Sequence, residues 1–388
     1  MRDAQPSTIY LSEYQVPAYL IDTTALVFEL GEESTKVSSQ LHIRRNPAST
    51  ISNAPLALHG TELELISLAI DGRTLDASEW TQSGEQLIIA IVPAEFVLSC
   101  ETRIRPQDNT SLEGLYKSSG MFCTQCEAEG FRKITYYLDR PDVMSVFTVE
   151  IIADAQRYPV LLSNGNLSAA EVLADGRHKT VWQDPFPKPA YLFALVAGKL
   201  ACVEDRFKTM SGRDVALKIY VEDKDADKCE HAMVSLKNAM RWDEEVYGRE
   251  YDLDIFNIVA VDDFNMGAME NKSLNIFNTS CVLAKPETTT DAGFQRVEGV
   301  VAHEYFHNWS GNRVTCRDWF QLSLKEGLTV FRDQQFSADM HSAAVTRIQN
   351  VRVLRSMQFA EDAGPMAHPI RPEKVIEMNN FYTLTVYE

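Results

Sequence analysis

The 388-residue chain is 45% hydrophobic and 24% charged, which allows more than one buried core and excludes a disordered or fibrous protein. Its formal net charge of −18 makes nucleic acids and anionic membrane surfaces poor partners, because both are bound through basic patches. Nowhere do eighteen apolar residues follow one another without a charge, so no membrane span is expected.

The first residues and the cysteines indicate a cytoplasmic protein. Residues 1–22 lack the basic start and apolar stretch of a secretory signal. The seven cysteines are an odd number spread over the whole length, so we expect reduced thiols and no disulfide framework. Cys123 and Cys126 form a single C-x-x-C pair, which without a second pair is weak evidence for structural zinc or redox chemistry.

Residues 1–199 predict an all-β domain. Short alternating or apolar runs are separated there by turn residues, a pattern typical of strands. We expect strands at 61–70, 87–92, 146–152 and 191–196.

Residues 200–388 predict a second domain in which strands and helices mix, so the fold class is a multidomain α+β protein. A helix is expected before Gly248, a candidate C-cap, because apolar residues recur there at helical spacing. These residues are Cys229, Met233, Leu236 and Met240. A strand is expected at 255–261, and two long helices at about 291–310 and 320–340.

The second of these predicted domains contains an H-E-x-x-H motif at residues 303–307. Within a helix this spacing places His303 and His307 one turn apart on one face, where both can bind one metal ion. From this composition the motif would arise by chance in roughly one such chain in a hundred. Glu326, on the next predicted helix, is the candidate third ligand if the chain turns at 311–312 and returns antiparallel.

Two histidines and a glutamate are a hydrolytic ligand set for one Zn²⁺ per chain, although ligand type alone does not exclude cobalt or manganese. Glu304 lies between the histidines in sequence, and we expect it to face a water at the open metal position. Zinc lowers the pKa of such a water to about 7, so a carboxylate beside it can accept its proton. Glu304 is therefore the candidate general base.

Residues 267–271 form a second motif, Gly-Ala-Met-Glu-Asn. Together with H-E-x-x-H and a glutamate eighteen residues later, it resembles the M1 family of metallo-aminopeptidases, which are gluzincins. The resemblance extends from residues 125–130 to residues 385–388. It implies a saddle-like N-terminal all-β domain followed by a thermolysin-like α/β catalytic domain.

The resemblance also implies which residues hold the substrate. Glu270 and Glu127 would bind the free α-amino group of a peptide, since an ammonium in a closed pocket needs carboxylates. The backbone of Gly267 and Ala268 would bind the peptide as an added strand. The remaining substrate-binding candidates, of which the first two would shape the pocket for the first residue, are Gln125, Met266, Met269 and Asn271.

Tyr387 resembles the family tyrosine whose hydroxyl stabilises the oxyanion of the tetrahedral intermediate. Residues 381–388 end the sequence without a cap, turn or polar tail, and family members continue well beyond this point. We therefore expect a truncated catalytic domain. If the chain is complete as given, its activity would be weak or absent; if it is a fragment, the functional prediction stands.

The predicted function is a zinc-dependent aminopeptidase of broad specificity that acts on peptides with a free N-terminus. A zinc endopeptidase would share the metal ligands but would not need Glu127 and Glu270. Epoxide hydrolysis occurs in one branch of the family, and Ala268 makes it less favoured by analogy. A module that only binds peptide N-termini would not need Glu304. The preferred first residue and the oligomeric state stay open.

Overall fold

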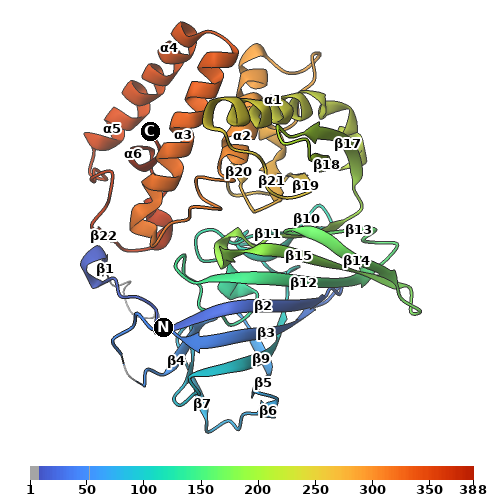
Figure 1. Cartoon of the computed structure of the whole chain (residues 1–388), viewed down its shortest axis with the longest axis vertical. Coiled ribbons are helices and arrows are strands. Elements are labelled where there is room, and N and C mark those ends of the chain that lie inside the picture. Colours follow the sequence, from blue (N-terminus) through green and yellow to red (C-terminus); the bar gives the residue numbers. More distant parts are fainter. Residues whose placement is uncertain (1–7, 52) are drawn as a thin grey trace.

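The structure, a computed structural model, describes residues 8–51 and 53–388. Residues 1–7, the start of the segment without a secretory signal, lie outside the described residues. Figure 1 shows a β-rich part built from the first half of the chain and, above it, a part in which helices accompany a smaller sheet. This order confirms the predicted α+β class with an all-β first part.

The largest sheet of the β-rich part has eight strands, and its long central strands alternate between buried and partly exposed residues. This alternation arises because successive side chains of a strand point to opposite faces. In sheet order the strands are β14 (Asn166–Val172), β15 (Arg177–Pro189), β12 (Met144–Asp154), β2 (Tyr19–Glu29), β3 (Thr35–Arg45), β9 (Glu95–Ile104), β5 (Glu64–Ile70) and β6 (Arg73–Thr74).

Two smaller sheets complete the β-rich part. One contains β4 (Leu56–His59), β8 (Gln86–Ile89) and β7 (Trp80–Ser83). The other contains β10 (Gly114–Ser118), β11 (Met121–Gln125), β16 (Leu195–Gly198) and β13 (Val160–Ser163). Strand β11 is buried along its whole length, and Glu127 lies two residues after its end.

The second part contains a five-stranded sheet whose central strands, β18, β19 and β21, are parallel. In sheet order its strands are β17 (Ala201–Lys208), β18 (Asp214–Val221), β19 (Ile255–Val261), β21 (Leu274–Asn278) and β20 (Ala268–Met269). A two-stranded pair, β1 (Ile9–Tyr10) with β22 (Lys374–Val375), joins the two parts of the chain.

Helices α2 and α3 of the second part carry the H-E-x-x-H motif and Glu326. The α-helices of this part are α1 (Glu230–Tyr247), α2 (Asp291–Phe306), α3 (Leu322–Met340), α4 (Ala343–Val353), α5 (Phe359–Asp362) and α6 (Leu384–Tyr387). A π-helical turn at Leu354–Gln358 connects α4 to α5. None of the helices in the described part of the chain is long and apolar enough to cross a membrane.

Several expected elements are confirmed, and one is corrected. The strand at 255–261 is β19, and α1 ends at Gly248, whose φ of 64° is the left-handed cap conformation. The strand expected at 191–196 is wrong at its start, because Ala190–Leu192 form a 3-10 helix and β16 begins at Leu195. A short buried apolar run does not show by its pattern whether it is strand or helix.

The predicted domains 1–199 and 200–388 meet between β16 and β17. This boundary stays a prediction, because one buried apolar cluster continues across it. The cluster contains Phe193 and Val196 from the first part together with Val259 and Trp319 from the second. A shared core holds the end of β11 firmly against the helical part, so residues from both parts can contribute to one site.

Candidate metal centre and peptide cleft

Helices α2 and α3 pack antiparallel and carry the residues of the H-E-x-x-H motif and Glu326. His303 near the end of α2 contacts Asp333, whereas Ser310, just beyond α2, contacts Thr329, four residues earlier on α3. Rising residue numbers on one helix therefore meet falling numbers on the other. This confirms the expected return of the chain after residues 311–312.

Gly311 allows the tight connection that brings the two helices together. Its φ of 145° is a conformation that residues with a side chain rarely adopt. A Cβ atom at this position would lie 2.9 Å from Nδ1 of His307 and 3.1 Å from Cγ of Lys325. Only glycine therefore leaves room for both side chains at the centre.

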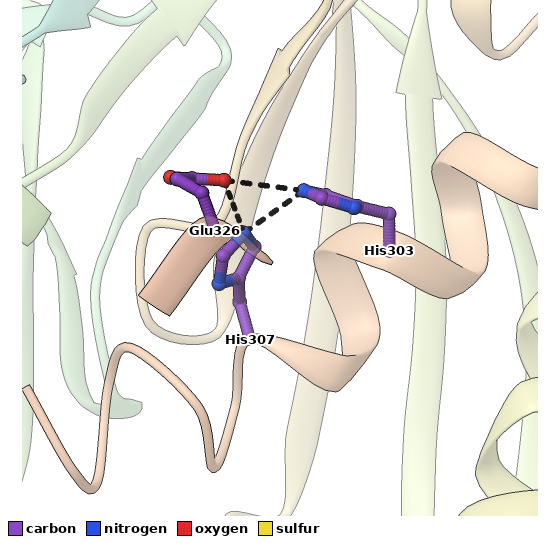
Figure 2. Close-up of side chains that lie close together, drawn as sticks. All are labelled: His303, His307 and Glu326. Atoms are coloured by element: carbon purple, nitrogen blue, oxygen red, sulfur yellow. Dashed lines mark hydrogen bonds and ion pairs between the residues drawn. The ribbon is translucent and has the colours of Figure 1, made fainter. Parts of the chain in front are cut away.

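His303, His307 and Glu326 converge on one point, as Figure 2 shows. The Nε2 atoms of the two histidines lie 3.0 Å apart, and Oε2 of Glu326 lies 3.5 Å from the first and 3.3 Å from the second. Ligand atoms around a tetrahedral zinc, with bonds of about 2.0–2.2 Å, are separated by about 3.3–3.5 Å. The triangle has the size that a metal ion requires.

The other ring nitrogens show that this triangle fits a cation. Nδ1 of His303 lies 2.6 Å from the Asp333 carboxylate, and Nδ1 of His307 lies 2.7 Å from the carbonyl oxygen of Ser310. Both Nδ1 atoms therefore donate, so that in the neutral rings a metal ion requires, both Nε2 atoms direct lone pairs at each other and at Glu326. A shared proton would relieve one of these three contacts, whereas a metal ion would relieve all three.

Glu304 is buried beside this centre. Its Oε2 atom has no hydrogen-bond partner within the described part of the chain. Burial raises the pKa of its carboxyl group to about 8, and the nearby charge of His303 opposes this shift. A buried carboxylate with a free oxygen is suited to exchange a proton with a molecule that enters the site.

A buried lysine lies among the carboxylates next to the metal ligands. Nζ of Lys325 lies 2.8 Å from Glu127 and 2.8 Å from Oε1 of Glu326, and it also contacts Glu270. The three glutamates come from the end of β11, from the loop after β20 and from α3. The predicted amine anchors, Glu127 and Glu270, are therefore brought together, with an internal ammonium group between them.

The two anchor carboxylates differ in charge state. Burial raises the pKa of Glu127 to about 8. Lys325 lowers this pKa, but the neighbouring carboxylates Glu270 and Glu326 oppose Lys325 and raise it. Burial acts on Glu270 as well, yet Lys325 beside it holds the pKa of this carboxyl below its usual range. The site therefore offers an ionised carboxylate and one that ionises only above neutral pH.

Residues 267–271 run along the edge of the five-stranded sheet. Strand β20 pairs with β21 on one side and is the last strand in the sheet order. The amide of Asn312 donates to the backbone carbonyl of Glu270 over 2.9 Å, which fixes this segment to the loop after α2. The outer edge of β20 is in the position where an extended peptide could add as a further strand.

A cleft of about 410 Å³ connects these groups. The predicted residues that line it are Glu127, Met266, Gly267, Ala268, Glu270, His303, Glu304, His307, Glu326 and Tyr387. Three other predicted residues, Gln125, Met269 and Asn271, are buried behind this lining. Nε2 of Gln125 lies 3.8 Å from the Met269 sulfur, so this pair supports the cleft wall from inside.

Sequence reasoning missed several residues of the site. Lys325 directly precedes the predicted ligand Glu326, but its sequence position gives no sign that it is buried. Asp333 lies one helical repeat of seven residues after Glu326, and this spacing on α3 was a usable signal. Tyr382 has a buried hydroxyl without a partner among the described residues, and Arg296 lines the cleft two turns before His303.

Comparisons with known proteins identify the family of the chain. The family model for the peptidase M1 N-terminal domain matches residues 21–192, and the model for the peptidase family M1 domain matches residues 231–388. Together the two matches span most of the chain.

Relatives match from one end of the chain to the other. Aminopeptidase N of Caulobacter vibrioides is 58% identical over 388 residues, which is 100% of this chain and 44% of the relative. Aminopeptidase N of Escherichia coli is 58% identical over 384 residues, which is 99% of this chain and 44% of the relative. The chain thus spans less than half the length of these relatives.

A solved structure supports the fold. Aminopeptidase A of Legionella pneumophila, in complex with aspartic acid, superposes with a TM-score of 0.92 at 36% identity, over 98% of this chain and 43% of that one. On the two family matches and these full-length similarities, the chain belongs to peptidase family M1.

Proposed function

We propose that this chain is the part of a zinc-dependent aminopeptidase that removes the first residue from peptides. The observation that carries the proposal is the triangle of His303, His307 and Glu326 beside the buried carboxylates of Glu127 and Glu270. The three metal ligands alone support a hydrolase. The two buried carboxylates, which can bind an ammonium group, support a hydrolase whose substrates must have a free N-terminus.

The metal ligands would be His303, His307 and Glu326, in a geometry that fits Zn²⁺. Zinc would supply Lewis-acid chemistry, polarising the peptide carbonyl and making water a better nucleophile. Glu304 accepts the proton from the attacking water and passes it to the departing amine, since it lines the same cleft and its Oε2 atom has no hydrogen-bond partner among the described residues.

Tyr387 donates from its hydroxyl to the oxygen on which negative charge develops. It lines the cleft, and burial holds its pKa well above the usual range, so the hydroxyl keeps its proton. A donor of this kind acts mainly in the transition state and therefore lowers the barrier.

Glu127 and Glu270 bind the substrate amine in the place where Lys325 now lies. An arriving α-ammonium must share these carboxylates with Lys325 or displace its side chain. The backbone of Gly267 and Ala268 at the edge of β20 aligns the peptide across the centre.

A zinc endopeptidase is the nearest alternative, and the buried amine anchors favour the aminopeptidase over it. Broad specificity for the first residue and a cytoplasmic location are part of the proposal, the latter resting on the sequence alone.

The test compares an alanyl anilide with its N-acetylated twin, each incubated with the 388-residue chain with and without a chelator. We expect cleavage of the free-amine substrate alone, and loss of this cleavage with the chelator. Cleavage of both substrates would remove the role of Glu127 and Glu270 and favour an endopeptidase. Matched variants, Glu127→Gln and Glu270→Gln, should raise KM for the free-amine substrate.

A further inference from the structure

The cleft continues past the metal centre along α2. Arg296, Gly299 and Val300 line it together with His303. These positions are separated by three, four and seven residues, so all four lie on one face of the helix. Arg296 is therefore part of the surface that faces a bound peptide.

Gly299 leaves the path between Arg296 and the metal centre open. A Cβ atom added at this glycine would meet no atom within 4 Å. The position one turn after Arg296 thus places no side chain between the guanidinium group and His303. A substrate side chain can occupy this space.

Arg296 has no carboxylate within 4.0 Å among the described residues. Its Nη2 lies 3.3 Å from the sulfur of Cys281, which packs beneath Gly267. By contrast, Arg313 and Arg332 of the same part of the chain each pair with an aspartate. The guanidinium of Arg296 is held against the cleft wall with its charge still available to a ligand.

The direction of a bound peptide follows from the amine anchors. Glu270 lies 4.0 Å from His307, on one side of the centre, whereas Arg296 lies two turns before His303, about 10 Å along the helix axis. A peptide with its amine at the anchors and its first carbonyl at the metal extends toward Arg296. Each extended residue advances about 3.4 Å, so the second and third side chains come within reach of the long arginine.

We propose that Arg296 is a specificity-determining residue that selects peptides with an acidic side chain at the second or third position. The inference rests on the proposed function, because the amine anchors set the position and direction of the peptide. It concerns the residues after the cleaved bond and leaves the choice of the first residue unchanged.

The test measures peptide binding by titration calorimetry with the zinc-loaded chain carrying Glu304→Gln, so that peptides bind without being cleaved. The peptides are Ala-Asp-amide and Ala-Ala-Asp-amide, each compared with its asparagine twin. Terminal amides remove the backbone carboxylate, so the pairs differ in one negative charge. We expect the aspartate peptide of at least one pair to bind about threefold to tenfold more tightly.

Arg296→Gln should abolish this preference, and Arg296→Glu should reverse it in favour of the matching lysine peptide. Arg347→Gln, which removes the same charge from an exposed position of α4, should leave it intact. Equal binding of both twins at both positions, or a preference that survives Arg296→Gln, would overturn the inference.

N-acetylated peptides separate this inference from the proposed function. If acetylation weakens binding but the aspartate and asparagine peptides bind equally, the role of Glu127 and Glu270 as amine anchors is supported and the role of Arg296 is contradicted. If acetylation has no effect, or if none of the peptides binds, the proposed function fails and the inference falls with it.

Discussion

Nδ1 of His303 on α2 lies 2.6 Å from Oδ2 of Asp333 on α3. This contact fixes the ring so that Nε2 points toward His307 and Glu326, the position from which it can bind a metal ion. Because the two residues come from different helices, the packing of α2 on α3 and the binding of a metal stabilise each other.

Asp333→Asn should weaken zinc binding by about tenfold to a hundredfold, which is typical when a residue that orients a histidine ligand is changed. Asparagine keeps the size of the side chain but removes the negative charge that favours the donating Nδ1. The measurement is the dissociation constant of zinc, obtained by competition with a chelator of known affinity.

Asp339→Asn is the matched control for this prediction. Asp339 lies on the same helix and accepts a hydrogen bond of 2.9 Å from the Trp242 indole, away from the cleft. Zinc affinity should be unchanged in this variant. An equal loss in both variants would mean that α3 is weakened in general, and unchanged affinity in Asp333→Asn would contradict the role of Asp333.

Lys325→Met should lower the free energy of unfolding by about 3 kcal/mol at neutral pH, because it leaves the ionised carboxylates of Glu270 and Glu326 buried without their shared cation. Methionine fills much of the same volume, so the loss reports on charge and not on a cavity. Urea unfolding of the metal-free chain gives the difference directly.

Lys285→Met serves as the control, since Lys285 pairs with Asp227 at a largely exposed position. Exposed pairs contribute little to stability because water screens them, so this variant should unfold almost like the unchanged chain. If Lys325→Met lowers the free energy of unfolding no more than Lys285→Met does, the buried carboxylates are neutralised by protons and do not depend on the lysine.

The parts of the fold that the sequence predicted well are those with a clear period. Strand β19 and the end of α1 at Gly248 follow from an apolar run and from helical spacing with a cap. Helices α4 and α5 were missed, because their apolar side chains, such as Ile348 and Phe359, are exposed and form no buried stripe. The spacing of apolar residues predicts a helix only where one face of the helix is buried, and these two helices bury few apolar side chains.

The site was predictable where spacing alone brings side chains together. His303 and His307 lie one turn apart, and Glu326 follows on the next helix, so local geometry and one turn suffice. Arg296 lies seven residues before His303 on the same helix, and this spacing was a usable signal. Lys325 was missed because its role depends on contacts between segments far apart in sequence. The contact of Lys325 with Glu127, which is nearly two hundred residues away, requires the packing of the β-rich part on the helices.

Tyr387→Phe should lower kcat for an alanyl anilide about a hundredfold to a thousandfold, the usual effect of removing one oxyanion donor. KM and zinc affinity should change little, because the hydroxyl acts on charge that develops after binding. Steady-state kinetics test this, and Tyr247→Phe, which removes a hydroxyl hydrogen-bonded to Gln335, is the control. A rise in KM alone would assign Tyr387 to substrate binding.

His59 at the end of β4 makes the stability of the β-rich part depend on pH. Burial, together with the charges of Arg132 and Arg140, lowers its pKa to about 4, and its Nδ1 accepts a hydrogen bond of 3.2 Å from the amide of Asp139. In the unfolded chain the pKa of a histidine is about 6.5. Between these values the unfolded chain binds one proton more than the folded chain.

Stability should therefore fall as the pH is lowered from about 6.5 to 4, and the contribution of His59 should amount to about 3 kcal/mol over this window. His59→Asn keeps an acceptor near the position of Nδ1 and removes the titration. Because all other titratable groups are the same in both proteins, the difference between their free energies of unfolding isolates the contribution of His59. That difference should shift by about 3 kcal/mol in favour of the variant between pH 7 and pH 4. A constant difference would show that His59 binds its proton as readily in the folded chain as in the unfolded chain.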